Sequence, residues 1–157
     1  MKSFLLAVFA APAVFAAPVP PAAAPTVAIA PGVRMPMVNL GLTNHTAWLL
    51  HGGRGVDTAL VYGDKAQRET GAAVRESALS RDDIFVTTKI PCCPAGKWLR
   101  AAGGSELMCD VLGHNTSKHV AHDMEMLGLE YVDLMLLHWP CDTFEETLAT
   151  YTTMEGM

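Results

Sequence analysis

The first 56 residues of the chain contain no aspartate or glutamate, and the whole sequence lacks the glycine-rich patterns that bind nucleotide phosphates. No G-x-G-x-x-G motif follows a strand, which excludes a Rossmann fingerprint, and the absence of G-x-x-x-x-G-K-[ST] excludes a P-loop. Basic residues are also sparse, and none form a patch with interleaved aromatic residues. Because the net charge is −5 and the pI is near 5.6, we expect no nucleic-acid partner.

Zinc-binding spacing is missing as well, although the second half of the chain carries several side chains that could ligate a metal. They are Cys92, Cys93, Cys109, Cys141, His114, His119 and His122. Their spacing matches no structural zinc pattern, and His119 and His122 are expected on the polar side of a helix, so we predict no metal site. A disulfide is compatible with an oxidising compartment, but the sequence does not tell which cysteines pair.

What is present is the composition of one folded domain. The chain has 157 residues, of which half are hydrophobic and 17% are charged. This length can bury a sizeable core, and the composition is typical of a globular rather than a disordered protein.

Residues 1–17 have the three parts of a secretory signal peptide. One basic residue, Lys2, precedes an apolar run from Phe4 to Ala10, and small residues follow up to Ala17. A membrane anchor is the alternative, but the apolar stretch is short for a bilayer core of ~30 Å and is interrupted by Pro12. We therefore expect cleavage of this segment, entry into the secretory pathway and no membrane association afterwards.

Residues 18–34 are rich in alanine, proline and valine, which predicts an extended linker or transit segment rather than a regular core. A signal peptide followed by an acid-free segment, with Phe15 near the junction, resembles the bipartite plastid-targeting presequence of algae with complex plastids. Simple secretion is the alternative, and both stay open. The folded domain is expected to cover residues 35–157.

The run from Val132 to Leu137 predicts the strand around which the domain is organised. It is almost entirely apolar, too short for a typical helix and stopped by Pro140, so we expect a strand buried on both faces, as in parallel sheets. His138 directly follows this run. A histidine at the carboxyl end of such a strand lies where α/β barrels carry their chemistry.

Two earlier strands are expected to end in reactive side chains in the same way. Residues 83–88 lead into Lys89, and a short apolar run leads into Asp57, with Tyr62 just beyond. If these strands are neighbours in a parallel sheet, Asp57, Tyr62, Lys89 and His138 converge on one rim.

At these positions the sequence resembles the aldo-keto reductase family in three ordered motifs. The matching stretches are Gly53-Arg54-Gly55-Val56-Asp57-Thr58-Ala59-Leu60-Val61-Tyr62-Gly63, Val86-Thr87-Thr88-Lys89, and the run from Tyr131 to Pro140. The segment from Met35 to Gly41 aligns with the family's first barrel strand, after which this chain has Leu42-Thr43 where the family usually has threonine and an aromatic residue.

The resemblance implies NADP(H)-dependent reduction of an aldehyde or ketone. The proton would come from Tyr62. A tyrosine side chain has a pKa near 10, and a nearby cation favours the phenolate that remains after the proton is donated. Lys89 would be that cation, Asp57 would hold its ammonium group, and His138 would orient the substrate carbonyl. The resemblance also places Gly41 and Asp57 in contact with the cofactor.

The resemblance further implies an α/β fold of the TIM-barrel type. The family's barrel has eight β/α units and typically ~250 residues, whereas the match here runs from about residue 35 to residue 157 and covers the first four units. We therefore predict a half barrel with open sheet edges that could self-associate. The alternative to an active reductase is a catalytically inactive half-barrel fragment or interaction module, or an incomplete gene product.

The expected helices alternate with the strands. A first helix covers residues 46–51, and a second begins at a capping box formed by Asp64 and Gln67. A third is capped by Thr116 or Ser117 and buries the stripe Val120, Met124 and Leu127 before it ends at Gly128. A fourth has a capping box of Thr143 and Glu146 and an apolar face of Phe144, Leu148 and Tyr151. The long connection 91–115 is expected to shape a substrate pocket.

Overall fold

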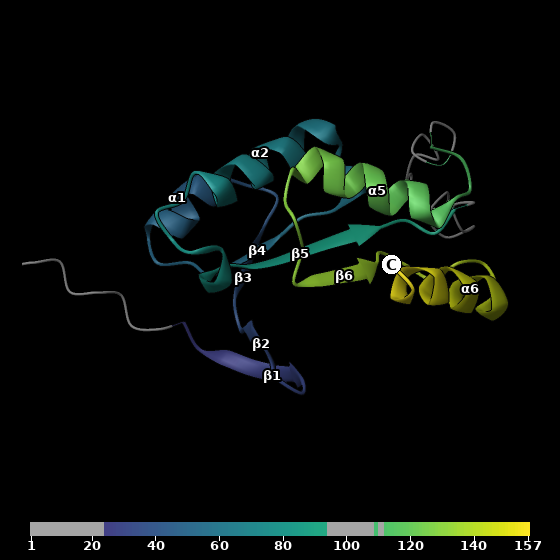
Figure 1. Ribbon diagram of the computed structural model, residues 1–157, viewed down its shortest axis with the longest axis horizontal. Coiled ribbons are helices and arrows are strands. Elements are labelled where there is room, and N and C mark those ends of the chain that lie inside the picture. Colours follow the sequence, from purple (N-terminus) through teal and green to yellow (C-terminus); the bar gives the residue numbers. More distant parts are fainter. Residues whose placement is uncertain (1–23, 94–108, 110–111) are drawn as a thin grey trace, which may run out of the picture.

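The computed structural model describes residues 24–93, 109 and 112–157. These residues form a two-stranded antiparallel sheet and a four-stranded parallel sheet, whose strands lie in chain order (Figure 1). The predicted signal peptide, the first part of the predicted linker and most of the 91–115 connection lie outside the described residues. None of the helices in the described part of the chain is long and apolar enough to cross a membrane.

The antiparallel sheet is a hairpin of β1 (Thr26–Ala30) and β2 (Val33–Pro36), where the sequence predicts an extended linker up to residue 34. The folded part thus begins before Met35. Gly32 in the turn has a φ of +78°, a backbone conformation that glycine adopts without strain. The Arg34 side chain closes the hairpin by donating to Thr26 Oγ1 at 2.8 Å. The alanine- and proline-rich composition predicted an extended linker here. The pairing of β1 with β2 depends instead on the turn at Gly32, which composition does not reveal.

The parallel sheet consists of β3 (Asn39–Gly41), β4 (Gly55–Asp57), β5 (Phe85–Ile90) and β6 (Leu134–Leu137), in the order β3-β4-β5-β6. Each strand is followed by a helix, as the alternating pattern predicts. The four strands therefore form successive β/α units, whose carboxyl ends meet at one rim.

Three helices lie on the same face of this sheet: α1 (His45–Leu50), α2 (Asp64–Arg75) and α5 (Thr116–Leu127) (Figure 1). Apolar side chains of β4 and β5, among them Val56 and Val86, pack under α1 and α2 in one core cluster. A second cluster around Ile90 and Val120 lies under α5. Helices α2 and α5 come so close that a Cβ on Gly71 would overlap the carbonyl oxygen of Leu127.

The start of α2 differs from the prediction. Asp64 is the first helical residue, and the N-cap position is Gly63, which has no side chain to cap the helix. The expected capping box is therefore wrong. Gln67 instead turns inward and is fully buried, because it has polar partners beneath the helix.

Helix α5 begins one residue earlier than expected, with Asn115 as its N-cap accepting from the Lys118 backbone amide. Its predicted end at Gly128 is confirmed, in the left-handed conformation. The expectation that His119 lies on the polar side is wrong, since this residue is buried. Burial is tolerated because His119 Nε2 makes a 2.8 Å hydrogen bond with the carbonyl oxygen of Gly113.

Helix α6 (Phe144–Glu155) begins with the predicted capping box of Thr143 and Glu146. Its apolar residues are exposed, however, with Phe144 at 74% and Leu148 at 51%. The preceding strand β6 is only half-buried instead of covered on both faces. The reason is that β6 is the edge of the four-stranded sheet, so nothing in the described residues covers its outer side.

Candidate active site

Asp57 and Lys89 lie on the same face of the sheet, opposite to the helices. Strand pairing places Asp57 level with Thr87, and side chains alternate along a strand, so Lys89 projects from the same face two residues closer to the rim. Lys89 Nζ forms an ion pair with Asp57 Oδ1 and donates to the Thr58 carbonyl oxygen at 2.9 Å. The Lys89 side chain is 14% exposed and that of Asp57 is 29% exposed, so the pair is largely shielded from water.

Tyr62 and His138 complete the cluster at this rim. Tyr62 ends a short 3-10 helix (Leu60–Tyr62) after β4, and its ring lies edge-on to that of His138 with 5.8 Å between the centroids. Lys89 Nζ lies 5.7 Å from the centre of the Tyr62 ring. His138 extends the sheet pairing because its backbone amide donates to the Ile90 carbonyl oxygen at 2.8 Å. The structure thus brings all four predicted catalytic residues together.

His138 is held in a partly desolvated position. Its ring stacks on Trp139 with a centroid separation of 4.3 Å. Burial and the nearby Lys89 cation lower the pKa of His138, and the opposite effect of Asp57 is smaller. The neutral imidazole is therefore favoured. Its Nδ1 atom is buried and has no hydrogen-bond partner among the described residues. A neutral ring of this kind can donate one hydrogen bond to a carbonyl oxygen.

Gly41, the other predicted cofactor contact, ends β3 in register with Asp57. A Cβ on Gly41 would come no closer than 3.9 Å to Asp57, which is an ordinary van der Waals distance. Packing within the described residues therefore does not require glycine here. The next residue, Leu42, has a φ of +40°, a backbone conformation that residues other than glycine rarely adopt.

Sequence reasoning missed a group of polar side chains behind the rim, which we call the buried polar cluster: Thr58, Gln67, Thr88 and Asp123. One signal could have found it. Asp123 lies three residues after Val120 and four before Leu127, on the buried stripe of α5. A carboxylate at this spacing faces the core, where it must be hydrogen-bonded to other buried polar groups.

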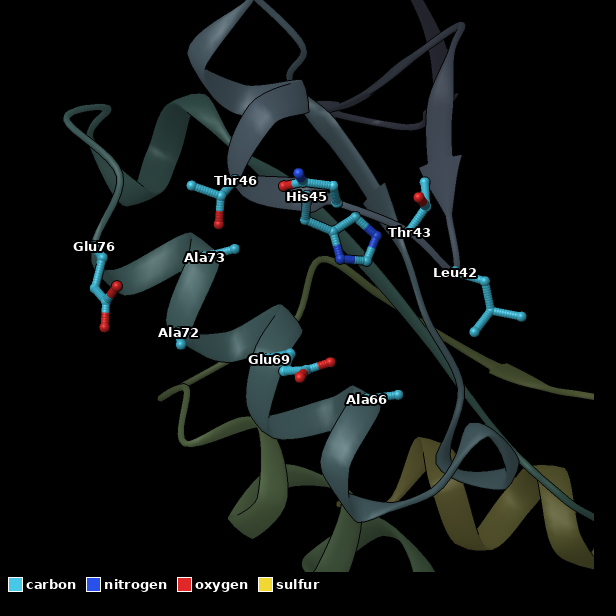
Figure 2. Close-up of a pocket in the computed structure, with 10 residues that line it drawn as sticks. Leu42, Thr43, His45, Thr46, Ala66, Glu69, Ala72, Ala73 and Glu76 are labelled. Atoms are coloured by element: carbon cyan, nitrogen blue, oxygen red, sulfur yellow. The ribbon is translucent and has the colours of Figure 1, made fainter.

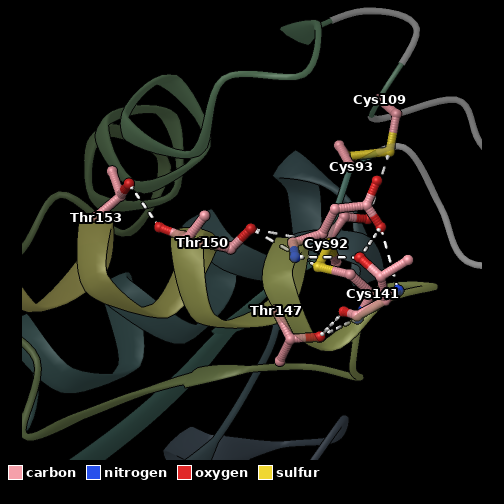
Figure 3. The surroundings of a disulfide bond; sticks show 10 residues. Cys92, Cys93, Cys109, Cys141, Thr147, Thr150 and Thr153 are labelled. Atoms are coloured by element: carbon pink, nitrogen blue, oxygen red, sulfur yellow. Dashed lines mark hydrogen bonds between the residues drawn. A yellow bond between two sulfur atoms is a disulfide. The ribbon is translucent and has the colours of Figure 1, made fainter.

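Two disulfides lie beside the rim (Figure 3). Cys92–Cys141 joins the segments that follow β5 and β6, and Cys93–Cys109 joins the start of the long connection to a later part of it. Thr150 of α6 places its hydroxyl 3.9 Å from Cys92 Sγ. The sequence could not distinguish this pairing from the two other pairings that four cysteines allow.

A hollow of about 470 Å³ lies apart from this cluster, between the start of α1 and the outer face of α2 (Figure 2). His45 borders it, and its ring nitrogens are engaged by the Leu40 carbonyl oxygen and the Thr70 hydroxyl, each at 3.1 Å. Burial lowers the pKa of His45. None of the four clustered rim residues lines the hollow, so we do not assign the chemistry to it.

The fold and the rim together define a β/α-barrel type of protein with a cluster of titratable side chains at the carboxyl ends of its strands. Residues 43–157 match the Aldo/keto reductase family, and the chain belongs to this family.

Comparison with known proteins gives the extent of this relationship. The chain is 33% identical over 118 residues to the 9,11-endoperoxide prostaglandin H2 reductase of Trypanosoma cruzi, covering 69% of this chain and 35% of that relative. It is 30% identical over 118 residues to the glycerol 2-dehydrogenase (NADP(+)) of Saccharomyces cerevisiae, covering 69% and 31%. The crystal structure of an aldo/keto reductase from Brucella melitensis is similar with a TM-score of 0.62 at 28% identity, over 84% of this chain and 48% of that one.

The chain thus spans about a third of the length of these curated relatives and just under half of the solved structure. The predicted fold class, parallel β/α units that match under half of a family barrel, is confirmed.

Proposed function

We propose that this protein reduces the carbonyl group of an aldehyde or ketone with NADPH as the reductant. The observation that carries the proposal is the contact geometry at the rim, where Asp57, Tyr62, Lys89 and His138 converge from three neighbouring strands. Membership of the aldo/keto reductase family and similarity to a yeast dehydrogenase named for NADP(+) support it.

The residues of the rim have complementary roles in this reaction. When bound, NADPH would supply the hydride for the carbonyl carbon. The Tyr62 hydroxyl would donate its proton to the carbonyl oxygen. Lys89 stabilises the phenolate that remains, because its ammonium group lies on the same side of the rim as the ring. Asp57 holds that ammonium group through the ion pair, and neutral His138 donates a hydrogen bond that orients the carbonyl.

The rim fits the nicotinamide end of the cofactor. Gly41 leaves room beside Asp57, and the buried Nδ1 of His138 has no partner among the described residues. We therefore place Gly41 and Asp57 against the nicotinamide.

The test compares wild-type protein with the Tyr62→Phe variant in NADPH oxidation, using a panel of aldehydes and ketones. Loss of the proton donor should lower turnover by about a hundredfold or more, while the dissociation constant of NADPH changes little. Near wild-type turnover of Tyr62→Phe would show that another group is the acid. Absence of both NADPH binding and turnover in the wild-type chain would refute the proposal for this chain.

A second proposal concerns the open side of the sheet: this surface binds a second copy of the chain. An apolar groove is lined by Leu137, Pro140, Phe144, Thr147, Leu148 and Tyr151. It adjoins β6, whose outer edge is unpaired in the described sheet. Apolar surface beside an open strand edge favours self-association.

Sedimentation over a range of protein concentrations tests this second proposal. We expect a dimer, and we expect Leu148→Asp to give a monomer while Thr152→Asp, an exposed position on the same helix, leaves the dimer intact. A wild-type protein that stays monomeric at every concentration would refute it.

We also propose that residues 1–17 act as a signal peptide and that the mature protein is plastid-targeted or secreted. The two disulfides support an oxidising compartment. Amino-terminal sequencing of the native protein decides between cleavage and retention, and an intact Met1 on a cytosolic product would refute the idea.

A further inference from the structure

The buried polar cluster joins four separate elements behind the active-site rim. Thr58 follows β4, Gln67 lies on α2, Thr88 on β5 and Asp123 on α5, and each side chain is at most 2% exposed. The four side chains come from four different elements, and they meet on the helix side of the sheet.

The hydrogen bonds inside the cluster form a continuous network. The Thr58 hydroxyl donates to Gln67 Oε1, and Gln67 Nε2 donates to Asp123 Oδ1. The Thr88 hydroxyl donates to the other carboxylate oxygen, Asp123 Oδ2, at 2.7 Å. Gln67 Nε2 also approaches Thr88 Oγ1 at 3.3 Å. The network therefore connects Thr58, which follows β4, to Thr88 on β5 through the side chains of Gln67 and Asp123.

Helix packing alone does not explain why these positions are polar. Burying a carboxylate and an amide costs free energy unless both are hydrogen-bonded, whereas apolar side chains of similar size would fill the same space without that cost. Helices α2 and α5 already approach closely at Gly71 and Leu127. A fully bonded buried network instead restricts the relative positions of the groups it joins.

Those groups include Thr88, the residue before Lys89, and Thr58, whose carbonyl oxygen is one acceptor of the Lys89 ammonium group. Thr88 precedes Lys89 in β5, and because side chains alternate, Thr88 points to the helices while Lys89 points to the rim. On the other side, the carbonyl oxygen of Thr58 accepts the 2.9 Å hydrogen bond from Lys89 Nζ. The network therefore holds the backbone that carries Lys89 and the carbonyl group to which Lys89 donates.

We propose that Gln67 and Asp123 are positioning residues that hold Lys89 in place through Thr58 and Thr88. The catalytic importance of this positioning rests on the proposed function, in which Lys89 stabilises the phenolate of Tyr62. The positioning itself is a property of the described residues and is testable without any turnover.

The first experiment measures how fast a small amine-acylating reagent modifies Lys89 in the folded chain, by mass spectrometry. Lys65, whose side chain is 87% exposed, is the internal reference. Thr58→Val removes the hydroxyl and keeps the side-chain size. It should raise the relative rate at Lys89 about fivefold, which corresponds to ~1 kcal/mol for one lost hydrogen bond. Thr58→Ser, which keeps the hydroxyl, should restore the wild-type rate.

Thr70→Val is the matched control. Thr70 is also a buried threonine, but its hydroxyl bonds to His45 and Ala66 rather than to the cluster. This variant should leave the Lys89 rate unchanged even though it removes a buried hydroxyl. Where Thr58→Val does not fold, Asp123→Asn is measured in its place and should show the same rise. An unchanged Lys89 rate in the folded variant, or an equal rise in Thr70→Val, overturns the proposal.

The second experiment follows NADPH-dependent turnover in the same variants. Thr58→Val should lower kcat about fivefold with little change in KM, and Thr58→Ser should recover it. A wild-type chain without turnover would refute the proposed function alone, because the Lys89 rates still decide whether the cluster positions this side chain. A turnover change in Thr58→Val without a change in the Lys89 rate would overturn the positioning role.

Discussion

Of the two disulfides beside the rim, Cys92–Cys141 should contribute more to stability than Cys93–Cys109. The two cysteines are 49 residues apart in the sequence, and each lies three residues after a rim residue, Lys89 or His138. The bond therefore joins the ends of β5 and β6 where the candidate site is formed.

The size of the effect follows from the entropy of the unfolded chain. A cross-link closing a loop of 49 residues removes about 4 kcal/mol of unfolded-state entropy at room temperature. The Cys93–Cys109 bond, 16 residues apart, lies within this loop and shortens the path by about a third. Because the entropy depends on the logarithm of loop length, the figure stays at about 4 kcal/mol. The Cys93–Cys109 bond itself should contribute about 3 kcal/mol.

The assay is urea unfolding of the wild-type chain and of two double variants. Cys92→Ala/Cys141→Ala should lose about 4 kcal/mol of unfolding free energy, and Cys93→Ala/Cys109→Ala about 3 kcal/mol. Wild-type protein in reducing buffer separates the effect of the bonds from that of the lost sulfur atoms. A Cys92→Ala/Cys141→Ala variant within about 1 kcal/mol of wild type would refute the reasoning.

Three further results are expected from the packing and the electrostatics. Gly71→Ala should cost about 2 kcal/mol or more in urea unfolding, because its Cβ would overlap the Leu127 carbonyl; an unchanged midpoint would contradict the close approach. Burial raises the pKa of Asp123 from 3.8 to about 6, and the hydrogen bonds from Thr88 and Gln67 offset this only in part. The group therefore adds about 3 kcal/mol to the unfolding free energy below pH 3.8, and this contribution is lost as the pH rises through 6. Asp123→Asn should flatten that part of the pH–stability profile, and a parallel profile would refute the assignment. Thr143→Ala should cost about 1 kcal/mol through the lost cap, measured by thermal unfolding, and no loss would mean that the helix frays there.

Local sequence patterns were sufficient for the elements whose causes are local. The start of α6 depends on Thr143 and Glu146, which are three residues apart, and the end of α5 depends on the conformational freedom of Gly128. Alternating strand and helix patterns require parallel units with their carboxyl ends at one rim. For this reason the sequence was enough to bring Asp57 and Lys89 to the same rim.

Only the tertiary structure decided which distant groups pair. Gln67 and Asp123 are separated by 56 residues, and neither the buried bond between them nor the Cys92–Cys141 pairing has a signal in the local sequence. The apolar run of β6 alone predicted burial on both faces, because an apolar strand looks the same in the sequence whether or not another strand covers it. Only the half-barrel prediction, which leaves the sheet edges open, anticipated its exposed side. Pattern and spacing determine which face of an element a residue occupies, whereas burial and pairing depend on what the rest of the fold places against that face.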